Sequence, residues 1–253
     1  MASLLFICAL IEEKNALTST LGSDTKEHLI SARLMIKVQQ YRQNSLDIYV
    51  CQCGMGNVNA GITLALILEQ LNIDQIVLIG VGGALHSKLN IGDMLISDRV
   101  IQHDYFASLE EGRYLMRPGD LILNAQQATD YEPIMRSAAS HLNISAYKHP
   151  HILITQGLIA SGSEFVGSLK RKNAIFDQCQ HALLVDMEAS AIASVANQFN
   201  TPFLIAKTVS DKLHSDGSIS DDFLEFLDIA SKNAAVIAQL IIIDMLDCAV
   251  LFK

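Results

Sequence analysis

Acidic and small polar side chains follow several short aliphatic runs, at the points where buried strands would end. A glycine-rich stretch, "GVGGAL" at 80–85, follows another such run, and the sequence predicts a turn at Gly80–Gly83. In open α/β sheets, ligands bind outside the carboxyl ends of the strands, so we expect these residues to face one site. Each acid alone could instead cap the helix that follows it. The candidates are Glu12, Glu13, Asp186, Glu188, Ser210 and Asp211.

A set of carboxylates suits the cleavage of a bond at an acetal-like carbon. The transition state of such a reaction resembles an oxocarbenium ion. One acid protonates the leaving group while another activates a water molecule. Further carboxylates can accept hydrogen bonds from sugar hydroxyls. The residues are therefore compatible with cleavage of a bond at an acetal-like carbon, one hypothesis among several at this point.

Other site types are disfavoured by spacing. The dinucleotide-binding pattern needs its third glycine where Leu85 stands, and "GMGNVNAG" at 54–61 lacks the Lys-Ser/Thr of a phosphate-binding loop. The histidines are scattered, and "KHPH" at 148–151 has no further ligands at metal spacing. We expect no metal and no organic cofactor.

Short strands alternating with helical patterns predict an α/β fold. The strands are expected at 4–9, 47–51, 76–79, 183–185 and 203–209, each apolar enough to be buried on both faces. The segments 93–106 and 151–161 also have strand-like sequences, so the sheet is expected to be mixed. Residues 222–247 predict a long closing helix, whose isoleucines could also serve a subunit interface. We therefore predict a single domain over 1–253, with three layers, α/β/α, around a central mixed β-sheet.

Composition excludes several classes of protein. Half of the 253 residues are hydrophobic, the formal net charge is −9, and no basic stripe suggests a nucleic-acid partner. "MASLLFICALIEEK" reads as a core strand rather than a signal peptide. No apolar run reaches the length of a membrane span, since aspartates interrupt "AQLIIIDMLDCAVLF" at 238–252. The odd number of cysteines, five, predicts reduced thiols in a cytoplasmic protein.

Six segments, in order along nearly the whole chain, resemble the 5′-methylthioadenosine/S-adenosylhomocysteine nucleosidases of the nucleoside phosphorylase superfamily. The resemblance implies the phosphorylase/hydrolase-like fold, hydrolysis of an N-glycosidic bond, release of adenine and a homodimer. The segments are "ALIEEKNAL" (9–17), "GMGNVNAGITLALILEQ" (54–70), "GVGGALHSKLNIGDMLISDRVIQHD" (80–104), "GLIASGSEFV" (157–166), "VDMEASAIA" (185–193) and "FLIAKTVSD" (203–211).

The resemblance assigns roles to single residues. Glu13 aligns with the acid that activates the attacking water, with Glu12 one place away. Asp211 aligns with the acid that donates a proton toward N7 of adenine, supported by Ser210. Protonating the base stabilises it as a leaving group while the C1′–N9 bond stretches.

The substrate-binding residues follow in the same way. Glu188 aligns with the carboxylate that accepts hydrogen bonds from ribose hydroxyls, and Met187 with the residue that packs beneath the sugar. Phe165 is expected to stack on the purine, and the Val166 backbone to hydrogen-bond it. Gly83 aligns with a glycine that approaches the substrate.

Four positions depart from the family pattern and leave the 5′-substituent open. Lys207 replaces an arginine beside the water and the glutamates, Val81 replaces a serine, and Asp186 shortens a glutamate. Asp221 falls near a phenylalanine that covers the 5′-group. No arginine precedes the glycine stretch and no serine stands at 81, so water is favoured over phosphate as nucleophile. The alternatives are a phosphorylase, a nucleosidase for another 5′-modified nucleoside such as futalosine or a deoxyadenosine, and a non-catalytic nucleoside-binding protein.

Overall fold

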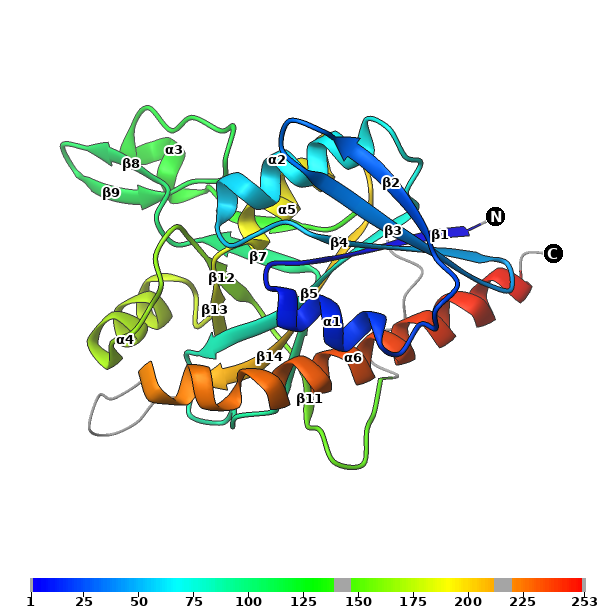
Figure 1. Cartoon of the computed structure of the whole chain (residues 1–253). Coiled ribbons are helices and arrows are strands. Elements are labelled where there is room, and N and C mark those ends of the chain that lie inside the picture. Colours follow the sequence, from blue (N-terminus) through cyan, green and yellow to red (C-terminus); the bar gives the residue numbers. More distant parts are fainter. Residues whose placement is uncertain (1, 139–146, 212–219, 252–253) are drawn as a thin grey trace.

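The computed structural model describes residues 2–138, 147–211 and 220–251, and a large β-sheet runs through most of them (Figure 1). Its principal path runs in the order β10-β7-β12-β13-β5-β1-β4-β3-β2, while β14 and β6 extend it from β5 and β11 pairs with β6. β8 and β9 form a separate hairpin. The strands are β1 (Ala2–Cys8), β2 (Lys26–Ser31), β3 (Ile36–Gln43), β4 (Leu46–Gln52), β5 (Gln75–Ala84), β6 (Met94–Ser97), β7 (Arg99–Gln102), β8 (Phe106–Leu109), β9 (Gly112–Leu115), β10 (Ile134–Arg136), β11 (Ile154–Gln156), β12 (Ile159–Ser161), β13 (Leu184–Asp186) and β14 (Phe203–Asp211).

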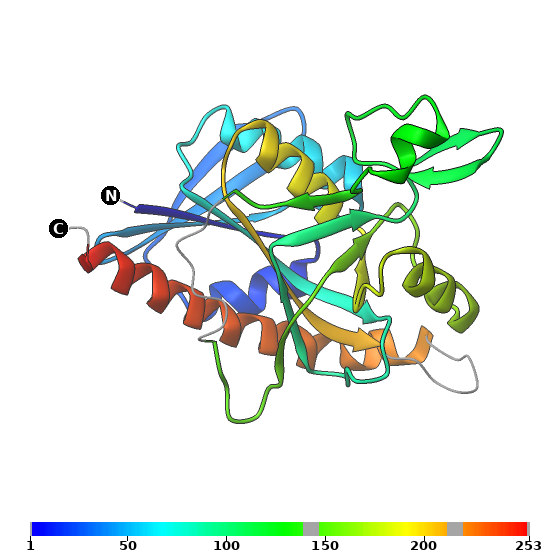
Figure 2. The same ribbon diagram turned by 180° about the vertical axis from the view of Figure 1, so that it is seen from behind.

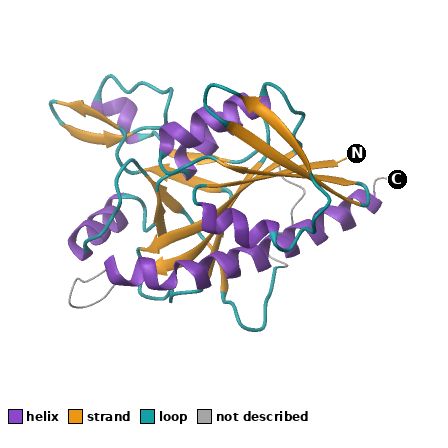
Figure 3. Cartoon of the chain, viewed as in Figure 1, coloured by secondary structure: helices purple, strands orange, loops and turns teal. Residues whose placement is uncertain are grey.

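Helices cover both faces of this sheet (Figures 2 and 3). α2 and α5 contact each other on one face, and α1 and α6 contact each other on the opposite face. α4 and the short α3 lie toward the end that also carries the β8–β9 hairpin (Figure 1). The helices are α1 (Ile11–Thr18), α2 (Asn57–Leu68), α3 (Ala125–Thr129), α4 (Leu169–Gln178), α5 (Ala189–Gln198) and α6 (Ser220–Leu251).

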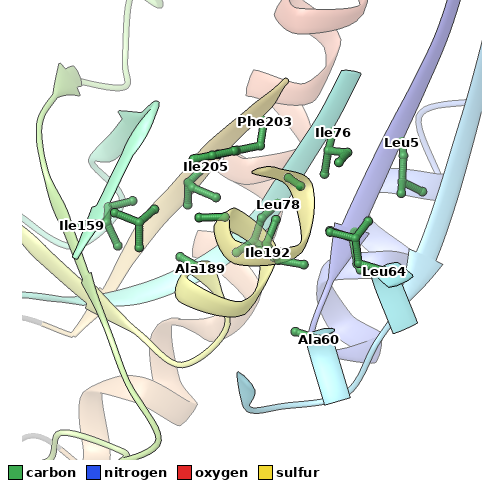
Figure 4. Close-up of a cluster of buried hydrophobic side chains, with 14 of the residues drawn as sticks. Leu5, Ala60, Leu64, Ile76, Leu78, Ile159, Ala189, Ile192, Phe203 and Ile205 are labelled. Atoms are coloured by element: carbon green, nitrogen blue, oxygen red, sulfur yellow. The ribbon is translucent and has the colours of Figure 1, made fainter. Parts of the chain in front are cut away.

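The alternation of side chains along β1 divides the core into two halves. Leu5 and Ile7 pack with the α2 and α5 side chains, whereas Leu4 and Phe6 pack with those of α1 and α6. This follows from the two-residue period of a strand. Figure 4 shows the first half, with Leu64 of α2 among the strand side chains. The predicted α/β fold with a mixed central sheet is confirmed, because β1, β4, β5 and β14 pair in parallel and β13 runs antiparallel to β5.

The glycine stretch 80–83 is strand, not the turn that the sequence suggests. β5 continues through it, pairing Gly80 with Lys207 of β14 on one side and Gly83 with Val185 of β13 on the other. The missing side chains permit this crowding: a Cβ on Gly82 would lie 2.5 Å from Leu184 Cδ2. Glycine at this position therefore allows β13 to approach β5 closely, and it does not serve to turn the chain.

Two segments expected to be single strands are each broken in two. Residues 93–106 form β6 and β7, and residues 151–161 form β11 and β12. β6 pairs with β14, whereas β7 pairs with β12 and β10, so each break moves the chain to another part of the sheet. At one break the Ser97 hydroxyl donates a hydrogen bond to the Arg99 carbonyl and accepts one from its N–H, which holds the bend.

The closing helix α6 is the one described segment that meets a length and hydropathy criterion for a membrane span, over Phe226–Asp247. One side of it is part of the core: Ala234, Ile237 and Ile241 pack against the sheet with residues of α1. This packing explains the apolar character of the helix by burial within the protein.

Candidate active site

Nine of the residues singled out by their place at strand ends or by the resemblance line one cavity of about 290 Å³. Its walls come from the start of α1, from β5, from the segment 164–166, from the end of β13 and from the end of β14. The members are Glu13, Gly83, Phe165, Val166, Asp186, Met187, Glu188, Ser210 and Asp211. The shared edge of the sheet therefore does bring these positions together.

Glu13 is held by three backbone N–H groups. Its Oε2 accepts hydrogen bonds from Ala9 and Leu10 at 2.9 Å each, and its Oε1 accepts one from Val81 at 2.9 Å. Because Glu13 is the third residue of α1, its carboxylate also caps that helix. The helix-capping interpretation is therefore confirmed for this residue, which also lines the cavity.

The electrostatics of Glu13 suit a proton acceptor. Burial raises its pKa above the usual range, and this effect exceeds the opposing influence of Lys207 and of the Leu10 and Val81 hydrogen bonds. The nearby Glu188 charge also raises the pKa. A buried carboxylate whose pKa is raised accepts a proton more readily than a free glutamate at neutral pH. Glu12, the alternative by one place, is exposed and does not line the cavity.

Lys207 lies beneath two carboxylates of the cavity wall and does not line the cavity itself. Its ammonium is 3.1 Å from Asp186 Oδ2 and 3.2 Å from Glu188 Oε2, and only 1% of the residue is exposed. Burial lowers the pKa of Lys207, but Asp186, Glu188 and Glu13 together raise it above its usual value. The lysine is therefore charged and neutralises this acidic group rather than lining the cavity, as its prediction as a substrate-binding residue would require.

Asp186 now has a definite structural role. Asp186 pairs with Lys207. In addition, both of its carboxylate oxygens lie 3.2 Å from the backbone nitrogen of Ala189, in the first turn of α5. Glu188 differs: its Oε1 accepts a hydrogen bond from Gly56 N–H at 2.9 Å, which joins it to the start of α2. Asp186 thus anchors the helix and the lysine, while Glu188 lines the cavity above them.

A second acidic centre is formed by Asp211 at the end of β14. The Ser210 hydroxyl lies 3.0 Å from Asp211 Oδ1 and 3.3 Å from the Gly82 carbonyl oxygen. Asp211 Oδ2 accepts a hydrogen bond of 2.5 Å from Lys172 of α4. A Cβ on Gly83 would lie 3.0 Å from Asp211 Oδ2, so this glycine leaves the acid its space.

The apolar part of the wall includes Met187, Phe165 and Val166. Val166 is buried, Met187 is half-buried, and Phe165 is 57% exposed at the mouth. An exposed aromatic face beside a cavity is suited to stacking on a planar base. The Val81 side chain also lines the cavity, at the position where a serine was expected by resemblance. Asp221 lies outside the residues whose side chains the structure describes.

Sequence reasoning misses Lys172 and the Gly56 backbone. Lys172 stands in the run Lys170-Arg171-Lys172, which resembles an ordinary solvated helix face, and only the tertiary structure shows that the third member is buried. The helical spacing of Lys172 and the apolar Ile175 is the signal that could have identified it. Among the described residues, no group of three or more His, Cys, Asp and Glu is placed to hold a metal ion.

Comparison with known proteins agrees with this architecture. The sequence model of the phosphorylase superfamily matches residues 5–243. The chain is 31% identical to the 5′-methylthioadenosine/S-adenosylhomocysteine nucleosidase of Staphylococcus haemolyticus over 236 residues, covering 93% of this chain and 97% of that one. It matches the crystal structure of S-adenosylhomocysteine nucleosidase from Streptococcus pyogenes in complex with 5-methylthiotubericidin, with a TM-score of 0.79, 26% identity and 94% coverage of both chains.

A third similarity concerns the fold alone. The futalosine hydrolase of Helicobacter pylori strain 26695 matches with a TM-score of 0.80 at 21% identity, covering 97% of each chain. The superfamily match and the 31% identity to a full-length relative rest on nearly the whole chain. The chain therefore belongs to the phosphorylase superfamily and, within it, to the 5′-methylthioadenosine/S-adenosylhomocysteine nucleosidases.

Proposed function

We propose that the protein hydrolyses the N-glycosidic bond of 5′-methylthioadenosine and S-adenosylhomocysteine and releases adenine. The observation that carries the proposal is the placement of two differently held carboxylates, Glu13 and Asp211, on the walls of one cavity. Glycosidic hydrolysis needs a base and an acid of this kind. Relatives named for this activity share the chain's length and fold.

Glu13 acts as the base in this proposal. It takes a proton from water as the water oxygen forms a bond to C1′ of the ribose. The three N–H groups that hold its carboxylate fix its orientation, and its raised pKa favours the proton transfer. Because the carboxylate is already ordered, little reorganisation is needed at the moment of reaction.

Asp211 acts as the acid. As the C1′–N9 bond breaks, its electron pair passes to the purine, and Asp211 donates a proton to N7. The Ser210 hydroxyl holds one oxygen of Asp211, which restricts the direction of the donation. The base then leaves as neutral adenine, a far better leaving group than its anion.

The remaining wall residues bind the substrate. Glu188 accepts hydrogen bonds from the ribose hydroxyls, since its carboxylate is fixed by Gly56 and Lys207. Met187 packs under the sugar, Phe165 stacks on the purine and the Val166 backbone hydrogen-bonds it. Gly83 leaves room for the base beside Asp211.

Water, rather than phosphate, is the nucleophile in this proposal. Among the described residues that line the cavity, none is a lysine or an arginine. Lys207, whose charge acts on Glu13, is already paired with Asp186 and Glu188. A phosphate dianion there would meet uncompensated negative charge.

One experiment tests the activity and the nucleophile together. The purified protein is incubated with 5′-methylthioadenosine, S-adenosylhomocysteine, 5′-deoxyadenosine and futalosine, with and without phosphate, and the free base and sugar product are separated and quantified. We expect adenine and free 5-methylthioribose without phosphate. Base release that requires phosphate would support the phosphorylase, and tight binding without release would support the nucleoside-binding protein. Preference for another nucleoside would change the assigned substrate but not the reaction.

We also propose a homodimer in the cytoplasm, with a role in methionine salvage that depends on the proposed substrates. The dimer is supported by exposed apolar side chains near the cavity: Val58 and Ile62 lie four residues apart on α2, with 74% and 45% exposed. The compartment is supported by four cysteines that are free thiols among the described residues. Light scattering coupled to gel filtration measures the mass, and Val58→Glu with Ile62→Glu is expected to yield a monomer.

A further inference from the structure

Lys172 occupies a position in α4 where the helix otherwise carries apolar side chains. Ile175 and Cys179, three and seven residues further on, belong to the core cluster beneath this helix. The neighbouring Lys170 is exposed, as expected for a surface lysine, whereas none of the Lys172 surface is exposed. The sequence therefore places a lysine in the buried stripe of an amphipathic helix.

The Lys172 ammonium points at the proposed catalytic acid. Its Nζ lies 2.5 Å from Asp211 Oδ2, and Asp211 is the one carboxylate within 4.0 Å of it among the described residues. A buried ammonium is costly unless it is paired, and an apolar residue at such a position often serves stability as well or better. Stability alone therefore gives no reason for a lysine here.

The chemistry at Asp211 does give a reason. An acid that protonates the leaving base must hold a proton at that moment, and an ionised carboxylate holds none. Ser210 and Gly82 supply only a hydroxyl and a carbonyl oxygen around Asp211. The Lys172 ammonium is the group beside it that carries a transferable proton, since an amine can give up a proton and a guanidinium cannot.

We propose that Lys172 is a positioning residue that supplies the proton which Asp211 passes to N7 of the leaving purine. An N–H bond of Lys172 breaks and an O–H bond forms on Asp211, while the O–H bond of Asp211 breaks and the N7–H bond forms. The electron pair of C1′–N9 moves into the purine, the water oxygen bonds to C1′, and the water proton passes to Glu13. After the products leave, Glu13 loses a proton to solvent and Lys172 regains one. This inference rests on the proposed hydrolysis.

The test uses two leaving groups on the same sugar. Adenine release from 5′-methylthioadenosine requires protonation at N7, whereas 4-nitrophenolate leaves a 5-methylthio-β-ribofuranoside as a stable anion. For Lys172→Met we expect kcat for adenine release to fall by about 10²-fold, the lower end of general acid catalysis, with KM nearly unchanged. With the nitrophenyl ribofuranoside, kcat should change by less than about threefold. Lys170→Met, on the exposed face of the same helix, is the control and should match the wild type with both substrates.

Two further measurements separate proton supply from a structural effect. Lys172→Met in an Asp211→Asn background should cost nothing more in adenine release, because the lysine acts through Asp211. The loss in Lys172→Met should be greatest at high pH, where solvent supplies few protons. Equal slowing of both substrates, or an additive effect in the Asp211→Asn background, would overturn the proposal; so would near-wild-type adenine release by Lys172→Met.

Melting curves of each variant show whether the substitution leaves the protein folded. If Lys172→Met does not fold, Lys172→Gln, which keeps a hydrogen-bond donor toward Asp211 but no transferable proton, undergoes the same comparison and must show the same dependence on leaving group. A wild-type protein that releases no adenine from any nucleoside refutes the proposed function instead, so the two failures are distinguishable.

Discussion

The backbone N–H of Val81 donates a hydrogen bond of 2.9 Å to Glu13 Oε1, linking the first turn of α1 to the middle of β5 across 68 residues of sequence. The strand thereby holds one oxygen of the carboxylate that is proposed to accept a proton from the attacking water. Because the contact comes from the backbone, the valine at this position preserves it. The serine expected by resemblance is not needed to orient Glu13.

Glu13→Gln should remove base catalysis and leave the protein folded. We expect adenine release to fall by about 10²- to 10⁴-fold, since an amide cannot accept the proton of water. A non-hydrolysable substrate analogue should still bind, as measured by calorimetry. Glu12→Gln changes an exposed neighbour and should retain wild-type turnover. Comparable losses in the two variants would show that the base has been assigned to the wrong residue.

The acid limb of the pH profile should reflect the buried carboxylate. Burial raises the pKa of Glu13, so it becomes protonated, and unable to act as a base, at a higher pH than a free glutamate with a pKa of about 4.3. We expect kcat/KM to decline below neutrality with a midpoint above that value. The same shift means that the folded state binds this proton more tightly than the unfolded chain. The stability contributed by this group is therefore present at low pH and is lost as pH rises through the folded pKa. A midpoint at or below that of free glutamate would contradict the assignment.

Gly80→Ala should displace Glu13. A Cβ at this position would lie 2.7 Å from the Glu13 Cδ and closer still to its Oε1. Since the carboxylate is held on three sides, it has to leave its hydrogen bonds to make room. We expect both activity and melting temperature to fall. Gly61→Ala is the matched control: its Cβ would meet Ala191 at an ordinary 3.6 Å, and alanine should stabilise α2 by up to about 1 kcal/mol.

Lys207→Met should destabilise the fold as well as the site. The substitution leaves Asp186 and Glu188 buried without their shared cation, which typically costs about 3–5 kcal/mol. Urea denaturation monitored by circular dichroism gives the free energy of unfolding. Lys232→Met removes an exposed pair with Asp228 and should change stability by less than about 1 kcal/mol. A loss at Lys207 no larger than at Lys232 would rule out its neutralising role.

Much of the fold can be predicted from local pattern. Doubly buried strands such as β1 and β14 show as continuous apolar runs, and Glu13, Glu188 and Asp211 stand out as acids at or near the ends of such runs. The glycines at 80–83 are the point at which prediction from local pattern fails. Local preference favours a turn there, but pairing with β13 and β14 on both sides keeps the segment extended. Tertiary contact overrides local preference at this point.

The order of residues is enough to predict the α/β class, the acids of the cavity wall and, through the resemblance, the family to which the chain belongs. Three features become visible in the folded chain alone: Glu13 rather than Glu12 faces the cavity, Lys207 lies beneath the carboxylates, and Lys172 reaches Asp211. The difference arises from the distance along the chain over which each interaction acts. A buried strand or helix face shows in the sequence as a periodic pattern of apolar residues that are close along the chain. A buried charge pair joins residues that are distant in sequence, so the packing of separate elements determines which residues form the pair.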